Sequence, residues 1–269
     1  MAGAGYTLDN YRRLIDRFRS AGYTFGQYDG DLTKDKLILL RHDIDYTLSY
    51  AVEFARLNAE MGIAGTFFIQ SRCRLYNLLD FDVQRALEEI AALGQHFGFH
   101  AVVDSEFESL EKLQKFVAEE FSLFSRFVPR TTPVFAWHNP SILSAQGFDH
   151  IKAEFPGLMN VYRAFGPGPI PYFADSNMRY TFDELCALAD QGHSAMQLAI
   201  APMQWCPEAE EMRTVMISNF KRKIADIEAG FAENYIYSDM FPTGLPENIY
   251  EEFGRLCAES AVGTKENIR

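Results

Sequence analysis

Short apolar runs alternate with helical patterns along this chain. The runs have the length of buried strands and lie at 37–40, 64–69, 97–99, 133–137, 171–174 and 195–200. Between many of them, apolar residues recur every three or four positions, which predicts helices at 46–62, 81–94, 106–127, 181–192 and 208–230. Strands that alternate with helices indicate βα units and a parallel sheet. This many units in one chain favour a closed or nearly closed barrel.

Two of the predicted helices carry signals at their ends. The segment "TFDELCALADQG" at 181–192 has the pattern of a capping box, in which Thr181 pairs with Glu184, and it closes on Gly192. Asp104 precedes the helix predicted at 106–127, and its position favours a role as the N-cap over a functional role.

Composition narrows the function classes. The chain has 269 residues, 48% of them hydrophobic, and we detect no linker, repeat or low-complexity tract, so we expect one domain over 1–269. The formal charge of −12 argues against a nucleic-acid partner, which requires a basic face. The four cysteines are scattered, the N-terminal residues lack a secretory pattern, and no apolar run has the length of a membrane span. We therefore expect a cytoplasmic protein.

Chemically capable side chains follow the ends of four predicted strands. After the strands at 37–40, 97–99, 133–137 and 171–174 come, in that order, His42, Asp43 and Asp45; His100 and Asp104; His138; and Asp175. The loops after the strands of a parallel barrel share one rim, where active sites are built. This placement predicts a site at that rim.

Each of these residues also has a purely structural interpretation. Asp43 and Asp45 could accept backbone N–H groups at the start of a loop, although two acids beside a histidine favour a functional role. His100 and His138 could pack among their aromatic neighbours, and their spacing leaves both interpretations open. As functional residues, Asp45, His100 and His138 form an N₂O set that suits zinc or another divalent first-row metal.

Five segments resemble, in their order and spacing, the polysaccharide deacetylases of carbohydrate esterase family 4 (CE4). "RHDID" at 41–45 resembles the first motif, Thr-Phe-Asp-Asp-Gly, in the His-Asp-x-Asp variant associated with surface-polysaccharide (O-antigen) gene clusters. "GIAGTFFI" at 62–69 resembles Gly-Ile-x-Ala-Thr-Phe-Phe-Val, and "GQHFGFH" at 94–100 resembles Gly-His-Glu-Ile-Gly-x-His. "WHNPS" at 137–141 and "QLAIAPMQW" at 197–205 fall where the family has Arg-Pro-Pro-Tyr and Leu-x-Ile-His-Pro.

The resemblance implies an α/β fold, a single distorted (β/α)₇ barrel with its motifs at about 37–205 and with N-terminal and C-terminal helices packed on it. It also implies a divalent metal, commonly zinc. By position, Asp43 would be the general base, and Asp45 and His100 would be metal ligands. The family's second histidine ligand corresponds to Asp104, which competes with His138 for the third ligand position.

Other positions in the motifs imply further roles. We expect substrate-binding roles for His42, Asn139, Asp175, Arg179 and Trp205. His138 stands where the family has an arginine that steadies the base, and it is also a candidate catalytic proton donor. Ala201 takes the place of the family's protonating histidine, and its methyl group cannot donate a proton.

These roles define the leading hypothesis and its alternatives. The leading one is a metal-dependent hydrolase that removes an acetyl group from an N-acetylated, nucleotide- or lipid-linked sugar in surface-polysaccharide biosynthesis. Because of Ala201, the alternative is a catalytically silent deacetylase-like protein that binds such a sugar or a partner protein. A third hypothesis is another metal-dependent amide hydrolysis on a small substrate.

Overall fold

The computed structural model describes residues 5–104, 106–139, 143, 148–163, 170–175, 178, 180–205 and 211–244. The chain divides into two compact units, residues 1–219 and residues 220–269. The strands of the described residues all belong to the first unit. The expectation of one domain over 1–269 stays a prediction beside this division.

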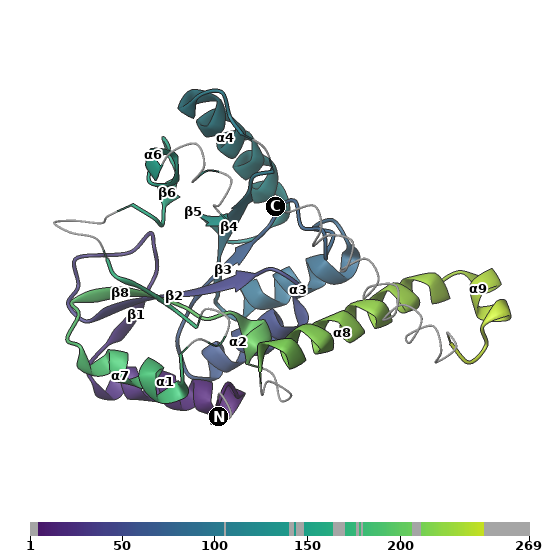
Figure 1. The fold of residues 1–269 in the computed structure, drawn as a ribbon, viewed down its shortest axis with the longest axis horizontal. Coiled ribbons are helices and arrows are strands. Elements are labelled where there is room, and N and C mark those ends of the chain that lie inside the picture. Colours follow the sequence, from purple (N-terminus) through teal and green to yellow (C-terminus); the bar gives the residue numbers. More distant parts are fainter. Residues whose placement is uncertain are drawn as a thin grey trace, which may run out of the picture. The chain divides into compact units, whose positions relative to one another are not determined.

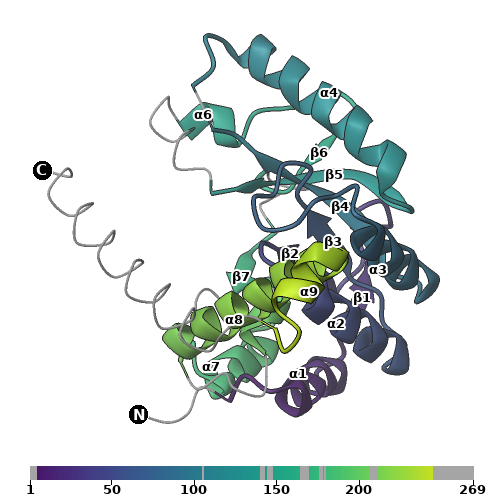
Figure 2. The same cartoon turned by 90° about the vertical axis from the view of Figure 1, so that its right-hand side faces the viewer.

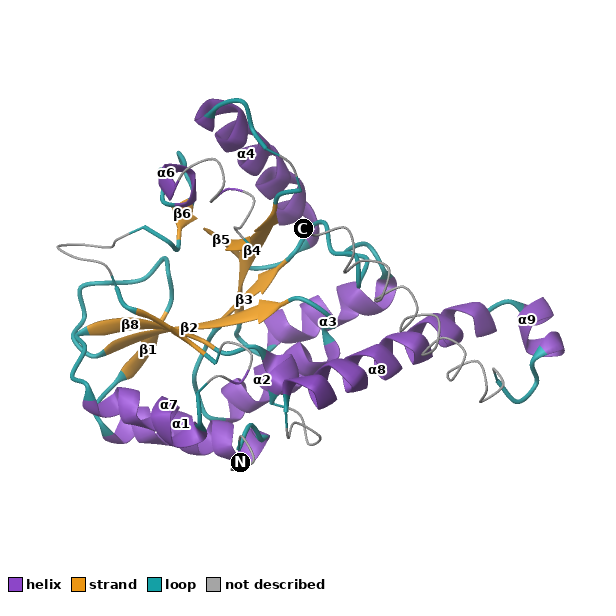
Figure 3. Ribbon diagram, viewed as in Figure 1, coloured by secondary structure: helices purple, strands orange, loops and turns teal. Residues whose placement is uncertain are grey.

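The first unit is built on one curled, parallel sheet (Figure 1; Figure 3). Its eight strands are β1 (Thr24–Gly26), β2 (Leu37–Ile44), β3 (Thr66–Ile69), β4 (His96–Val102), β5 (Thr131–His138), β6 (Met159–Asn160), β7 (Tyr172–Ala174) and β8 (Ala195–Ala199). Their order is β6-β5-β4-β3-β2-β8-β7, and β1 pairs with β2 from outside this path. The curled parallel sheet confirms the predicted α/β class and agrees with a distorted, partly open (β/α)₇ barrel.

Helices lie between many of these strands, in the predicted alternation, and others precede β1 or follow β8. They are α1 (Leu8–Ser20), α2 (Ser49–Glu60), α3 (Phe81–Ala92), α4 (Leu110–Phe127), α6 (Phe148–Ile151), α7 (Phe182–Ala187), α8 (Met212–Ala232) and α9 (Tyr235–Met240). Short 3₁₀ turns, η2 (Leu188–Asp190) and η3 (Pro202–Gln204), follow α7 and β8. Figure 2 shows α2 and α3 lying beside β2 and β3. None of the helices among the described residues is long and apolar enough to cross a membrane.

The helix caps confirm one sequence prediction and correct another. Thr181 and Glu184 form the capping box of α7, with each side chain bonded to the other's backbone N–H. At the start of α4 the cap is Ser109, whose side chain accepts from the N–H of Lys112. Asp104 is therefore not the N-cap, because α4 begins several residues later than the hydrophobic pattern suggested.

Strand β2 is longer than its apolar run, and this changes how its polar residues are oriented. The strand continues to Ile44, so His42 and Asp43 lie inside it and not in a loop after it. Successive side chains of a strand point to opposite faces. Leu37 and Leu39 accordingly join the small apolar cluster on the concave face, whereas Ile38 and Leu40 join the large core under the helices.

The second unit is described by itself. Its described part holds the C-terminal portion of α8, from residue 220, and α9. Asn234 caps α9, because its side chain accepts a hydrogen bond from the N–H of Ile236. The ring of Phe231 stacks against that of Tyr237, with centroids 5.8 Å apart.

Candidate metal centre

The strand register brings three polar residues of neighbouring strands into one row. Parallel pairing places Ile44 of β2 opposite Ile69 of β3, and Ile69 opposite Phe99 of β4. The next residue along each strand is Asp45, Gln70 and His100, respectively. His138 ends β5 opposite Val102, two residues beyond His100 on the same face of β4. Segments far apart in the sequence thus meet at the carboxyl ends of adjacent strands.

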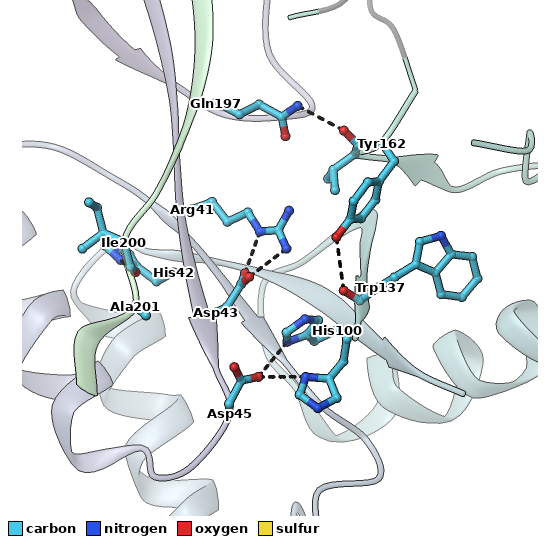
Figure 4. Close-up of polar contacts among 12 residues, drawn as sticks. Arg41, His42, Asp43, Asp45, His100, Trp137, Tyr162, Gln197, Ile200 and Ala201 are labelled. Atoms are coloured by element: carbon cyan, nitrogen blue, oxygen red, sulfur yellow. Dashed lines mark hydrogen bonds and ion pairs between the residues drawn. The ribbon is translucent and has the colours of Figure 1, made fainter. Parts of the chain in front are cut away.

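Asp45, His100 and His138 form a compact cluster of possible ligands. One ligand atom from each residue lies within 4.8 Å of the other two. Asp45 Oδ1 is 3.1 Å from His138 Nδ1 and 3.4 Å from His100 Nδ1 (Figure 4). Asp104, the competing third ligand, is exposed and lies outside this cluster, because β4 ends at Val102.

The electrostatics of the cluster favour a bound cation. Burial opposes ionisation of Asp45, but the hydrogen bond to His138 and the attraction of both imidazoles outweigh burial and lower its pKa to about 2. Burial lowers the pKa of His100, so this ring is neutral at pH 7 and its nitrogens can act as ligands. The hydrogen bond to Asp45 is the main cause that raises the pKa of His138.

The hydrogen bonding of His100 Nδ1 indicates whether the cluster suits a metal. Nδ1 of His100 is buried and has no hydrogen-bond partner among the described residues, although it faces Asp45. Leaving a buried polar atom unsatisfied costs about 1–3 kcal/mol, so such atoms call for an explanation. A cation held between His100 Nδ1 and Asp45 Oδ1 would supply the missing interaction. The donor set of two imidazoles and one carboxylate suits zinc or a related divalent ion.

Arg41 is a site residue that sequence reasoning missed. Its guanidinium binds Asp43 through two parallel hydrogen bonds, Nε to Oδ1 at 2.6 Å and an η nitrogen to Oδ2 at 2.8 Å (Figure 4). The Arg41 side chain is only 2% exposed and lies over the rings of Phe68 and Tyr172. The sequence signal was its spacing, since residues two apart in a strand share a face.

This pairing corrects the expected partner of the base. The motif alignment put His138 in the place of the arginine that steadies Asp43. In the structure Arg41 holds Asp43, while His138 lies against Asp45. The arginine therefore comes from the same strand as the carboxylate and not from the strand that carries His138.

A cavity of about 140 Å³ opens beside both aspartates. Its described lining comprises Asp43, Asp45, Tyr172, Ala174, Asp175, Ala199, Ile200, Ala201 and Gln204. Ala201, whose side chain is only a methyl group, thus lines the cavity that Asp43 and Asp45 share. The resemblance assigns this position to a protonating histidine. Ala201 lines the cavity there but has no proton to donate.

Asp175 lines this cavity, but its carboxylate is held by the chain itself. Its Oδ2 accepts hydrogen bonds from the backbone N–H of Ala201 and from Trp205 Nε1, both at 2.8 Å. Trp205 is only 1% exposed and packs in the core. Trp205, which was expected to bind substrate, therefore acts here as a donor that positions Asp175, because its indole N–H needs a partner when buried.

Of the remaining expected substrate-binding residues, His42 and Asn139 are not part of the described lining of the cavity. His42 is fully buried on the helix side of β2, where Nδ1 contacts the Ile200 carbonyl at 2.9 Å and Nε2 contacts Asn58 at 3.1 Å. With both ring nitrogens engaged in the core, it does not reach the cavity on the other face (Figure 4). Asn139 is exposed just past β5, and Arg179 lies outside the described residues.

Comparisons with known proteins complete the description. No family model matches the chain, and no curated protein matches it. Among solved structures, it matches a CE4 family pseudoenzyme from Bacillus anthracis with a TM-score of 0.42 and 12% identity, over 71% of this chain and 62% of that one. A family 4 acetyl xylan esterase from Clostridium thermocellum, in complex with a cobalt ion, gives a TM-score of 0.42 and 14% identity, over 70% of this chain and 85% of that one.

A third match is the catalytic domain of a peptidoglycan N-acetylglucosamine deacetylase from Eubacterium rectale. Its TM-score is 0.37 at 14% identity, over 77% of this chain and 90% of that one. The chain spans less than two thirds of the length of the pseudoenzyme. It is therefore similar in structure, at low sequence identity, to CE4 deacetylases and to a CE4 pseudoenzyme.

Proposed function

We propose that this protein is a metal-dependent hydrolase that removes the acetyl group from an N-acetylated sugar. The observation that carries the proposal is the Asp45–His100–His138 cluster next to the Arg41–Asp43 pair, with both aspartates on one cavity. A link to surface-polysaccharide biosynthesis, a nucleotide- or lipid-linked substrate and zinc as the metal come from the motif resemblance and belong to the same proposal.

In the proposed chemistry, Asp45 and Asp43 have different roles because their surroundings differ. Asp45, His100 and His138 would hold the ion, which when bound supplies a Lewis acid for the acetamide carbonyl and lowers the pKa of a water. Asp43 would accept the proton of that water. Its two oxygens are oriented by Arg41, and each carboxylate oxygen keeps a further lone pair for a second hydrogen bond.

Protonation of the leaving amine requires a proton donor at the cavity. His138 was a candidate for this role as well as for metal binding, and the two roles compete. The membership of His138 in the ligand cluster supports the ligand role, and once bound to the cation its Nδ1 would have no proton to donate. The cavity wall beside Asp43 offers only Ala201 at the family's position.

Ala201 is also the specific observation that favours the second candidate, a catalytically silent protein that binds an acetylated sugar or a partner. A general acid contributes about 10²–10⁴-fold to a rate, so its loss alone slows a deacetylase by about that factor. Such a protein would keep the metal cluster and the cavity but would not turn over its ligand.

Acetate release separates the two candidates. The purified protein is loaded with Zn²⁺, Co²⁺ or Mn²⁺ and incubated with N-acetylglucosamine oligomers and with a UDP-linked N-acetyl sugar. The proposal expects metal-dependent release that is lost in Asp43→Asn with metal retained, and lost together with the metal in His100→Ala. Asp104→Asn, which removes an exposed carboxylate outside the cluster, is the matched control and should behave as wild type. Stoichiometric metal without turnover on any substrate would favour the silent candidate.

A further inference from the structure

The amide of Gln70 lies among the ligand atoms of the cluster. Gln70 Nε2 is 2.9 Å from Asp45 Oδ1 and 3.3 Å from His138 Nδ1. The residue is only 4% exposed, and it stands in the middle of the row that runs from Asp45 through β3 to His100. Its backbone N–H donates to Tyr76 Oη, which in turn donates to the Ile44 carbonyl, so the start of the side chain is anchored to β2.

The separations among these atoms match those of a coordination shell. Ligand atoms that each lie about 2.0–2.1 Å from one ion are about 3.3 Å apart in a tetrahedron and about 2.9 Å apart at the corners of an octahedron. The distance from Asp45 Oδ1 is 3.1 Å to His138 Nδ1, 3.4 Å to His100 Nδ1 and 2.9 Å to the Gln70 amide nitrogen. Measured from Asp45 Oδ1, the Gln70 amide nitrogen is as near as either imidazole nitrogen.

The orientation of this amide depends on what fills the centre. Without a cation, Asp45 Oδ1 accepts a hydrogen bond from the NH₂ group of Gln70, which also lies 3.3 Å from His138 Nδ1. With a cation between the same atoms, an NH₂ group in this place would be repelled. Rotation of the terminal amide by half a turn brings Oε1 to the position of Nε2, because the two atoms occupy nearly the same volume.

We propose that Gln70 is a fourth protein ligand of the cation, through Oε1, and that its NH₂ group donates a hydrogen bond to Asp45 Oδ1 when the cluster is empty. This inference rests on the proposed metal site and goes beyond the Asp-His-His set. It makes the donor set N₂O₂, which is harder than N₂O and suits ions that accept five or six ligands. Four protein ligands would fill a tetrahedral ion, so a water could bind only to an ion with a higher coordination number.

Metal affinity alone does not decide between a ligand and a neighbour. The removal of a residue that merely donates a hydrogen bond to Asp45 from outside the shell can also lower the affinity by about 10–100-fold. The number of waters bound directly to the ion does decide, because a lost ligand is replaced by water whereas a lost outer donor is not.

The experiment therefore counts inner-sphere waters by water-proton relaxation dispersion on the Mn²⁺-loaded protein. We expect Gln70→Ala to show one more bound water than the wild type and to bind Mn²⁺ about 10-fold more weakly. Gln197→Ala is the matched control, since Gln197 is also buried but bonds Tyr28 and the Val161 carbonyl in the sheet. It should leave the water count unchanged.

A second variant tests the same role of Gln70 if Gln70→Ala folds poorly. Gln70→Glu puts an anionic oxygen where the proposal places Oε1, so it should bind Mn²⁺ more tightly than the wild type at pH 7. An unchanged water count in metal-loaded Gln70→Ala, or weaker binding by Gln70→Glu, would overturn the role of Gln70 while leaving the Asp-His-His site intact. Failure of the wild type to bind Mn²⁺, Co²⁺ or Zn²⁺ would overturn both the proposed function and this inference.

Discussion

Arg41 holds both carboxylate oxygens of Asp43 from two positions earlier on the same strand, at 2.6 and 2.8 Å. The arginine side chain is 2% exposed and that of the aspartate is 20% exposed, so the cation is the more deeply buried partner. The strand geometry alone makes the pair possible, because residues two apart point to the same face. The proposed base is thus oriented by its own strand.

We expect Asp43→Leu to destabilise the protein by about 3 kcal/mol, because it leaves the Arg41 guanidinium buried without its partner. Urea unfolding curves measure this difference. The double variant Arg41→Met with Asp43→Leu should recover most of the loss, since it removes both charges and fills the space with apolar groups. A double variant as unstable as the sum of the two single variants would show that the pair is not the cause.

We predict different effects on metal affinity for alanine substitutions at His138 and at Asp104. His138→Ala should lower the affinity for Zn²⁺ by at least tenfold, because it removes one of three converging ligand atoms. Asp104→Ala should leave the affinity within about twofold, since Asp104 is exposed and outside the cluster. Isothermal titration calorimetry at one pH and salt concentration measures both. A large loss of Zn²⁺ affinity in Asp104→Ala would instead indicate that Asp104 is the third ligand, as the family's ligand spacing implies.

The stability of the protein should fall in mild acid partly because of His42. Burial lowers its pKa from 6.5 to about 4, so the folded protein keeps His42 neutral between these values while the unfolded chain takes up a proton. This contribution is complete above pH 6.5 and is lost as the pH falls towards 4, at a total cost of roughly 3 kcal/mol.

The check is the slope of the free energy of unfolding against pH between 6.5 and 4. In His42→Asn the slope should be shallower by the share of one titrating group, even though the variant is less stable at every pH. An identical slope in the wild type and the variant would mean that His42 is not the group whose protonation destabilises the folded protein.

Ala201→His tests whether the missing acid limits turnover. The residue lines the cavity beside Asp43 and Asp45, so an imidazole there can reach a leaving amine. If the wild type releases acetate slowly, we expect the variant to raise kcat by about 10²-fold, the lower end of the effect of a general acid. Ala174→His, which adds an imidazole to another wall of the same cavity, is the matched control and should not raise kcat.

Local pattern was enough to predict the α/β class, the alternation of strands and helices, and the α7 capping box. These features depend on periodicity and on residues a few positions apart, which the sequence shows directly. The same pattern also pointed to Asp45, His100 and His138 as an N₂O set, because each stands at the end of an apolar run. Strands β1 and β6 were missed because each holds a single apolar residue, Phe25 and Met159, and so forms no apolar run.

Only the tertiary structure decided which of these residues meet. The extension of β2 to Ile44 turned His42 into the core and Asp43 towards Arg41, and a one-residue shift in the pairing register of β2 would exchange these faces. The register of β3 between β2 and β4 placed Gln70 beside Asp45, and the end of β4 at Val102 left Asp104 outside. Register and strand ends arise from pairing between distant segments, and no local stretch of sequence specifies them.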